Sequence, residues 1–296
     1  MAPVERRLVR VPVGDVAPSG VETVAVEIIA PITGPRRPLI WWMLPGGSLS
    51  RRYWDLHGGD GSYSCAGFLA EHGYACALID HPGVGDSDVP DDGYALTPRV
   101  LADVNATVRQ RIVGMLPELF DDRRTIGCGH SMGGTITVIA QAHHRSHTAL
   151  CLLGASGRGL PELIDDHERA YVDRPAALRA DIAMLVKRRF GESMPLRPFV
   201  AAQILAEARA PLLAVAGLSA MIPGNINDEI AQIDVPVMLG LGQHDMGVGM
   251  AEAAAQLTGI DKLFQFVLPN AGHNHNAGSN RWGMWQAMLD WADTLE

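Results

Sequence analysis

The feature that most constrains this chain is a serine set between two glycines, at the junction of two apolar runs. The sequence Gly129-His-Ser131-Met-Gly133 follows a run from Arg124 that is fit for a buried strand, and a run fit for a helix comes after it. In so tight a turn, side chains two residues to either side of the serine would collide, so glycine is required there. The pattern predicts a strained turn that exposes the Ser131 hydroxyl above a sheet, where the N–H of Met132 can face an oxyanion.

The motif alone is weak evidence, because a glycine-rich turn with an idle serine also occurs by chance. Its context strengthens it, since strand-like and helix-like segments alternate along most of the chain and predict a mostly parallel sheet with helices on both faces. Two β-branched runs within residues 8–30 predict an antiparallel hairpin at a sheet edge. The other expected strands are 38–44, 74–80, 148–154, 235–241 and 262–268, and the expected helices are 61–72, 98–120, one ending near 145, 249–258 and 280–294.

The alternation stops between residues 156 and 231. This stretch predicts several helices, from 168 to 190 and again from 198 to about 221, broken by prolines and glycines. A helical insert between two strands of one sheet would lie above the carboxyl ends of the strands, where ligands bind in open α/β sheets. We therefore expect one core made of residues 1–155 and 232–296, with a helical cap at 156–231.

Two further loops follow expected strands and carry residues that can assist a serine. Asp245 lies in Gly242-Gln-His-Asp, and His273 lies in Ala271-Gly-His-Asn. Because parallel strands bring their carboxyl ends to one edge, Ser131, Asp245 and His273 should meet there. A serine hydroxyl is a poor nucleophile until an imidazole takes its proton, and a carboxylate can hold that imidazole in the right tautomer. The order serine, aspartate, histidine is the order found in α/β-hydrolases.

With these residues in view, the chain resembles an α/β-hydrolase-fold serine hydrolase with a helical cap, over nearly its whole length. The loop Asp80-His-Pro-Gly-Val-Gly-Asp-Ser87 adds to the resemblance. The family usually has His-Gly in its first oxyanion loop, and Leu-Pro-Gly46-Gly47 stands there in this chain. The resemblance implies that the backbone N–H groups of Gly47 and Met132 form the oxyanion hole, with Ser48 as the alternative to Gly47.

Each candidate has a rival interpretation. Asp245 could be the N-cap of the helix that follows it, although no acid stands in the loop after the strand at 148–154. His273 competes with His244 and His275 for the role of base, and His275 and His130 are expected to be packing or supporting residues. In the loop after the strand at 74–80, the polar residues are expected to shape the loop rather than to do chemistry: Asp80, His81 and Asp86.

Cysteines and clustered histidines give no sign of a metal centre. His143, His144 and His147 fall at an expected helix end without a fitting cysteine or acidic ligand, which favours a solvated helix terminus. Neither a metal nor a cofactor is expected. Four cysteines lack C-x-x-C spacing and are expected to be buried free thiols: Cys65, Cys76, Cys128 and Cys151.

Composition narrows the partners. With 47% hydrophobic and 19% charged residues, the 296-residue chain can bury a large core. Its net charge of -9 argues against nucleic acid or an anionic membrane as a partner. It has no apolar run long enough to span a bilayer and starts without the apolar core of a signal peptide, so a cytoplasmic location is expected.

Together these features predict a cofactor-independent serine hydrolase that cleaves a carboxylic ester, thioester or lactone of a small molecule carrying an acyl group. Two alternatives use the same three residues for acyl transfer or for carbon–carbon bond hydrolysis. A third alternative is a small-molecule receptor with the same fold. The sequence does not identify the natural substrate, because specificity resides in the insert rather than in the fold. It does not determine the oligomeric state either.

Overall fold

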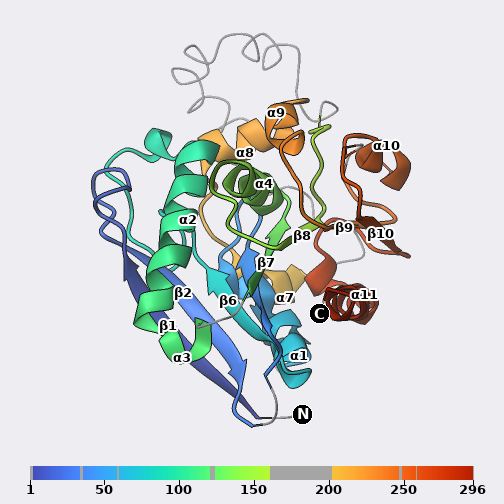
Figure 1. Ribbon diagram of the computed structural model, residues 1–296, viewed down its shortest axis with the longest axis horizontal. Helices are drawn as coiled ribbons and strands as arrows, with labels where there is room; N and C mark the ends of the chain where they lie inside the picture. Colours follow the sequence, from blue (N-terminus) through green and yellow to red (C-terminus); the bar gives the residue numbers. More distant parts are fainter. Residues whose placement is uncertain are drawn as a thin grey trace.

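An eight-stranded, mostly parallel sheet forms the centre of the protein (Figure 1). The computed structural model describes residues 3–33, 36–58, 60–120, 124–160, 202–246, 249–257 and 259–295. The strands lie in the order β1-β2-β6-β3-β7-β8-β9-β10. Their bounds are β1 (Val4–Pro12), β2 (Thr23–Pro31), β3 (Leu39–Leu44), β6 (Ala75–Ile79), β7 (Arg124–His130), β8 (Ala149–Leu153), β9 (Val237–Gly242) and β10 (Leu263–Leu268).

The strand pairing confirms the predicted fold class. β1 and β2 form the expected antiparallel hairpin at one edge of the sheet, and β2 is also antiparallel to β6. From β6 onwards every pair is parallel, so β3, β7, β8, β9 and β10 end at the same edge. β3, β6 and β8 are buried along their whole length, which explains their continuous apolar sequences.

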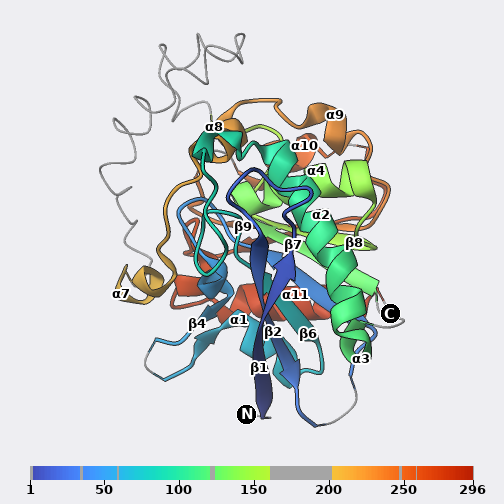
Figure 2. The ribbon, with the colours of Figure 1, turned by 90° about the vertical axis from the view of Figure 1, so that its left-hand side faces the viewer.

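Helices cover both faces of the sheet (Figures 1 and 2). α2 (Pro98–Met115) and α4 (Met132–His144) pack on one face, where they share an apolar cluster with the strands. α1 (Cys65–Glu71) and α11 (Trp282–Asp293) pack on the other face in a second cluster. All four cysteines are free and buried in this second cluster, as predicted.

Two elements differ in their bounds from the prediction. The helix expected from residue 61 begins only at Cys65, because the Ser64 hydroxyl accepts the N–H of Gly67 and caps it. A short two-stranded sheet, β4 (Asp55–Leu56) with β5 (Tyr63–Ser64), precedes it. The helix expected over 98–120 divides into α2 and α3 (Pro117–Phe120), because a proline disfavours helical geometry in the residue before it.

Part of the predicted cap falls within the described residues. It contains α7 (Ala202–Leu205), the 3-10 helix η4 (Ala206–Ala208), α8 (Ala214–Met221) and α9 (Asn227–Ile230). The helices expected between 198 and 221 are interrupted, as predicted, at residues 209–213, where Arg209 forms a bridge with Leu49. Pro211 accounts for the break, since it lacks an N–H and disfavours a helical residue before it. The helix expected over 168–190 lies outside the described residues.

The last part of the core returns to alternating elements. α10 (Met250–Ala255) lies between β9 and β10, close to the predicted helix at 249–258. α11 matches the predicted closing helix within two residues at each end. Among the helices that the structure describes, none is long and apolar enough to cross a membrane.

Candidate active site

Ser131 occupies the strained turn that its glycine neighbours predict. It follows β7 directly, begins α4, and has a φ of 52° and a ψ of -121°. The turn is tight enough to exclude side chains, because a Cβ on Gly129 would lie 2.4 Å from the carbonyl oxygen of Gly133. A Cβ on Gly133 would lie 2.5 Å from the carbonyl oxygen of Leu44. The surroundings therefore impose the positive φ of Ser131, as expected for a strained functional turn.

Asp245 and His273 lie together beyond the ends of β9 and β10. The Nδ1 atom of His273 lies 2.5 Å from Oδ1 of Asp245. A carboxylate can only accept, so Nδ1 carries the proton and donates it, which leaves Nε2 of His273 as the free acceptor. The side chain of His273 is 12% exposed and that of Asp245 only 2%. The pair is therefore nearly enclosed, with the imidazole on the more open side.

The carboxylate of Asp245 is saturated with donors. Besides His273, Oδ1 accepts the backbone N–H of Met246 at 2.7 Å, and Oδ2 accepts that of Gly242 at 3.0 Å. The fourth donor is His275, whose Nε2 lies 3.0 Å from Oδ2. Two donors on each oxygen fix the plane of the carboxylate and favour its ionised form.

The pKa of Asp245 reflects these opposing influences. Burial acts to raise it, since an ionised group loses hydration in the interior. The charge interaction and hydrogen bond with His273, together with the contact with His275, outweigh burial and hold the pKa well below its usual value. Asp245 is thus an anion over the whole range in which an imidazole works as a base. The rival interpretation as a helix cap is wrong, because Gly249 is the N-cap of α10.

The competing histidines have separate places. His275 is buried against Asp245, and His244 lies in an exposed part of the loop after β9. His130 donates from Nε2 to the carbonyl oxygen of His273 at 2.8 Å, and its ring stacks on Tyr53 with centroids 4.5 Å apart. Burial lowers the pKa of His130 well below its usual value, so it stays neutral. It supports the backbone that carries His273.

The end of β8 connects the serine turn with the histidine. The backbone N–H of Ser131 donates to the carbonyl oxygen of Leu153 at 2.8 Å. The next residue, Gly154, has a φ of 62° and lies under the imidazole, since a Cβ there would be 2.9 Å from Cε1 and Nδ1 of His273. The same Cβ would lie 3.6 Å from Oδ2 of Asp245. Leu153 therefore holds the serine turn, and the next residue, Gly154, lies close to His273 and Asp245.

The loop after β3 contributes the candidate oxyanion donor. A Cβ on Gly46 would lie 3.2 Å from Cβ of Ser131, and one on Gly47 would lie 3.9 Å from Sδ of Met132. The two glycines therefore bring bare backbone against the serine turn. Ser48, the alternative donor, has a φ of 61°. The left-handed residue turns the chain so that the N–H of Leu49 donates back to the carbonyl oxygen of Gly46.

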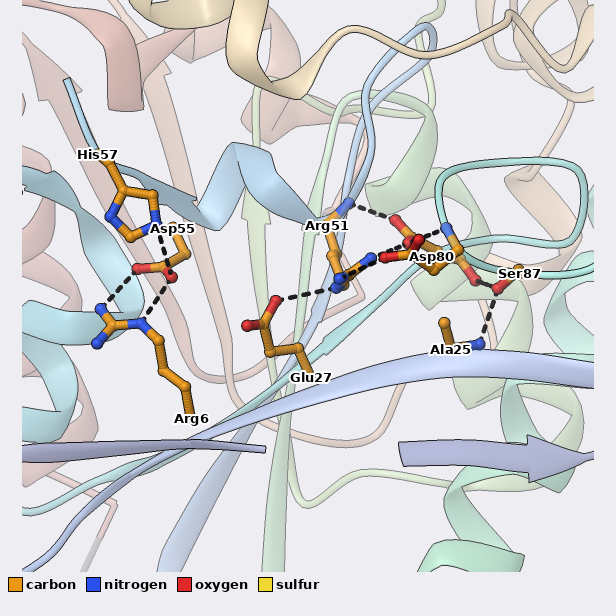
Figure 3. Close-up of polar contacts among 9 residues, drawn as sticks. Arg6, Ala25, Glu27, Arg51, Asp55, His57, Asp80 and Ser87 are labelled. Carbon is orange, nitrogen blue, oxygen red and sulfur yellow. Dashed lines mark hydrogen bonds and ion pairs between the residues drawn. The ribbon is translucent and has the colours of Figure 1, made fainter. Parts of the chain in front are cut away.

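A buried arginine holds this oxyanion loop to its neighbours (Figure 3). Figure 3 shows the guanidinium of Arg51 between Glu27 on β2 and Asp80 at the end of β6. Its Nε lies 3.0 Å from Glu27, Nη1 contacts Asp80, and Nη2 lies 2.7 Å from Asp86. The backbone N–H of Arg51 also donates to Asp80 at 2.7 Å. Ion pairs with three carboxylates therefore hold Arg51, at the end of the oxyanion loop, in place.

The residues after β6 shape their own loop, as predicted, and also contact the loop after β3. Asp80 is fully buried and accepts the N–H of Asp86 at 2.9 Å. A Cβ on Gly85, which has a φ of 58°, would collide with the carboxylate of Asp80, so glycine is needed there. His81 has its Nε2 atom 3.3 Å from the carbonyl oxygen of Pro45 in the oxyanion loop. These residues shape two loops at once.

Sequence reasoning missed part of this arrangement. Nothing local marks Arg51 as buried, because its partners are 24 and 29 residues away. Residue type and position identified Asp245 and His273, but not the second histidine on the carboxylate. Within the described residues, no group of three or more His, Cys, Asp or Glu side chains is arranged to hold a metal ion.

Comparisons with known proteins identify the family and the fold. A family model described as "Alpha/beta hydrolase family" matches residues 43–281. No curated protein matches the sequence. Similar solved structures include a thermophilic esterase from Thermogutta terrifontis, with 18% identity, a TM-score of 0.64, and coverage of 97% of this chain and 98% of that chain.

Two further solved structures carry other activities in their descriptions. An enol-lactonase from Burkholderia xenovorans is 18% identical, with a TM-score of 0.60 and coverage of 91% of this chain and 97% of its own. A bromoperoxidase from Bacillus anthracis is 17% identical, with a TM-score of 0.61 and coverage of 97% of this chain and 100% of its own. At these identities the likeness establishes the fold and no particular substrate.

Proposed function

Because the chain belongs to the alpha/beta hydrolase family, we propose that it is a serine hydrolase that cleaves a carboxylic ester or a related acyl bond, such as a thioester or lactone. Ser131 is the nucleophile, His273 the general base, and Asp245 the residue that orients the imidazole. Two observations carry the proposal: the 2.5 Å contact between His273 and Asp245, and the strained turn that holds Ser131.

Acylation begins when Oγ of Ser131 attacks the carbonyl carbon of the substrate. Its proton passes to Nε2 of His273, the nitrogen that does not face Asp245. The carbonyl oxygen becomes an oxyanion and accepts hydrogen bonds from the backbone N–H groups of Met132 and Gly47. Nε2 then returns its proton to the leaving oxygen, the carbon–oxygen bond breaks, and the acyl group stays on Ser131.

Deacylation repeats these steps with water in place of the serine. Nε2 of His273 takes one proton from the water as its oxygen attacks the acyl carbon, and the second oxyanion occupies the same donors. The proton then returns to Oγ of Ser131, and the carboxylic acid leaves. Asp245, held ionised by its four donors, stabilises the imidazolium in both halves of the reaction.

The substrate is proposed to be a small molecule with an acyl group. Two of the similar structures are an esterase and an enol-lactonase, which supports an ester or a lactone as the substrate. We also propose that residues 156–231 act as a cap over the core formed by 1–155 and 232–296. A cap in this place would select the substrate and exclude bulk water from the oxyanion.

The test compares wild type with Ser131→Ala on short p-nitrophenyl esters. Loss of the nucleophile should lower kcat by several orders of magnitude. Ser279→Ala, which removes an exposed hydroxyl before α11, is the matched control and should keep the wild-type rate. Equal rates for wild type and Ser131→Ala would contradict the proposal.

Labelling with a fluorophosphonate separates a hydrolase from a receptor of the same fold. The probe should modify Ser131 in wild type and in Ser279→Ala, and should leave Ser131→Ala unlabelled. A receptor with a dormant site would label poorly in all three proteins. Adding an alcohol acceptor to the ester assay then distinguishes acyl transfer, which yields a new ester, from hydrolysis.

A further inference from the structure

Leu212 occupies a space that two glycines on different elements leave open. A Cβ on Gly47, in the oxyanion loop, would lie 3.1 Å from Cδ1 of Leu212. A Cβ on Gly217, in α8, would lie 3.0 Å from the same atom. The isobutyl group of Leu212 therefore fills the space between the candidate oxyanion donor and the helix above it, and it remains partly exposed.

The position of Leu212 is fixed by the core. The N–H of Ser50 donates to the carbonyl oxygen of Ala208 at 2.8 Å, and the N–H of Ala210 donates to that of Ser48 at 2.9 Å. Glu207 accepts the N–H groups of His57 and Gly58 at 2.8 and 3.0 Å. The segment that leads to Leu212 is thus bonded along the oxyanion loop.

The neighbouring residue points the other way. Leu213 is only 6% exposed and packs near Gly83, where a Cβ would lie 3.4 Å from its Cδ2. Successive side chains of an extended segment point to opposite sides, so burial of Leu213 directs Leu212 toward the oxyanion loop. Leu212 thus lies beside Gly47 and is partly exposed.

The layout of the sheet indicates which part of a substrate would meet this surface. Gly47 follows β3, on one side of β7, whereas His273 follows β10, on the other side. The leaving alcohol must face His273 to receive its proton, and the oxyanion must face the N–H groups of Gly47 and Met132. Because the leaving group takes the side of His273, we assign the acyl group to the other side of the carbonyl carbon, where Leu212 lies beside Gly47.

We propose that Leu212 is a specificity-determining residue that limits the bulk of the acyl group next to the carbonyl carbon. The inference rests on the proposed function. Truncation of Leu212 opens space beside Gly47 for a branched acyl group, and a methyl group on Gly217 pushes Leu212 into that space. The two changes should therefore shift substrate preference in opposite directions.

The experiment measures kcat/KM for p-nitrophenyl acetate and p-nitrophenyl pivalate, which differ only in branching next to the carbonyl. The ratio of pivalate to acetate should rise about tenfold in Leu212→Ala and fall in Gly217→Ala, since a misfit of a few carbon atoms in an apolar pocket has effects of this size. The double variant should resemble Leu212→Ala, because the added methyl then has nothing to push.

Leu205→Ala is the matched control, because it deletes the same atoms from a leucine buried in the second apolar cluster. Its ratio should equal that of wild type. An unchanged ratio in Leu212→Ala, with activity still dependent on Ser131, would overturn this inference alone. A shift seen only when the alcohol is varied, in methyl and tert-butyl acetates, would also overturn it. Activity that does not depend on Ser131 would overturn the proposed function as well.

Discussion

At the scale of single residues, the site depends on backbone conformations that few residues adopt. Ser131 is a non-glycine residue at positive φ, a conformation that costs about 1–3 kcal/mol and persists only where neighbours impose it. Gly154 combines a φ of 62° with a position so close to the imidazole of His273 that a Cβ would lie 2.9 Å from the ring. The first feature presents a hydroxyl, and the second makes room for the ring that is proposed to deprotonate it.

The contact at Gly154 gives a prediction. In Gly154→Ala the new methyl would lie 2.9 Å from two ring atoms of His273 and would also strain the backbone. The displaced imidazole should lower kcat about a hundredfold, the effect expected of a misplacement near 1 Å. Steady-state kinetics on p-nitrophenyl acetate provides the measurement. Gly93→Ala is the control, because a Cβ there meets no atom within 4 Å, and a normal rate in Gly154→Ala would refute the role of this contact.

At the scale of elements, three loops at the carboxyl edge of the sheet are bonded to one another. The loop after β3 is held by Asp80 and His81 from the loop after β6, through Arg51 and Pro45. The segment before α8 runs along its other side. The candidate oxyanion donor is therefore positioned by its neighbours rather than by its own sequence.

The central ion pair of this arrangement can be tested. Arg51 is 3% exposed and Asp80 is fully buried, so Arg51→Gln leaves a buried carboxylate without its cation. We expect the free energy of unfolding to fall by about 3–5 kcal/mol, measured by urea denaturation. The value of kcat should fall more than KM rises, because the oxyanion loop loses its anchor.

Two further variants sharpen this test. Arg51→Lys restores the charge and should recover part of the stability, although it cannot reach three carboxylates with a planar fork. Arg99→Gln removes an exposed ion pair with Asp103 and should change stability little. If Arg51→Gln proved as stable as wild type, the anchoring role would be excluded.

At the scale of the whole molecule, two apolar clusters enclose polar groups on both faces of the sheet. Burial lowers the pKa of His81 to about 4 and that of His147 to about 3. Nδ1 of His147 lies 2.9 Å from the hydroxyl oxygen of Thr125, within hydrogen-bond distance. The folded protein therefore keeps these imidazoles uncharged at pH values where the unfolded chain protonates them.

This difference predicts a loss of stability in mild acid. Each of these histidines has a folded pKa below its unfolded value of about 6.5, so the unfolded state binds more protons below that pH. The free energy of unfolding that they contribute is therefore complete above pH 6.5 and declines as the pH falls toward 4. Each histidine contributes at most about 1.4 kcal/mol per pH unit. Urea unfolding at several pH values should give a smaller slope for His147→Gln than for wild type. Exposed His72→Gln is the control, and identical slopes for wild type and His147→Gln would contradict the prediction.

Much of the fold could be predicted because its signals are local. The continuous apolar runs at Leu39–Leu44 and Ala149–Leu153 became buried parallel strands, and Gly129 and Gly133 marked the serine turn. Pro211 marks the break at residues 209–213 locally, but the bridge between Arg209 and Leu49, 160 residues apart, has no local signal. Where long-range bonds decide a conformation, local patterns do not reveal it.

The amino-acid sequence by itself determined which residues stand at the ends of the strands, because glycine sterics and the period of apolar residues act over a few positions. It thereby assigned Ser131, Asp245 and His273 to one edge of the sheet. Only the tertiary structure decided that His275 shares the carboxylate of Asp245, that Arg51 is buried among three acids, and that Leu212 lies against Gly47. These contacts join residues far apart in the chain, and their distances depend on how whole elements pack.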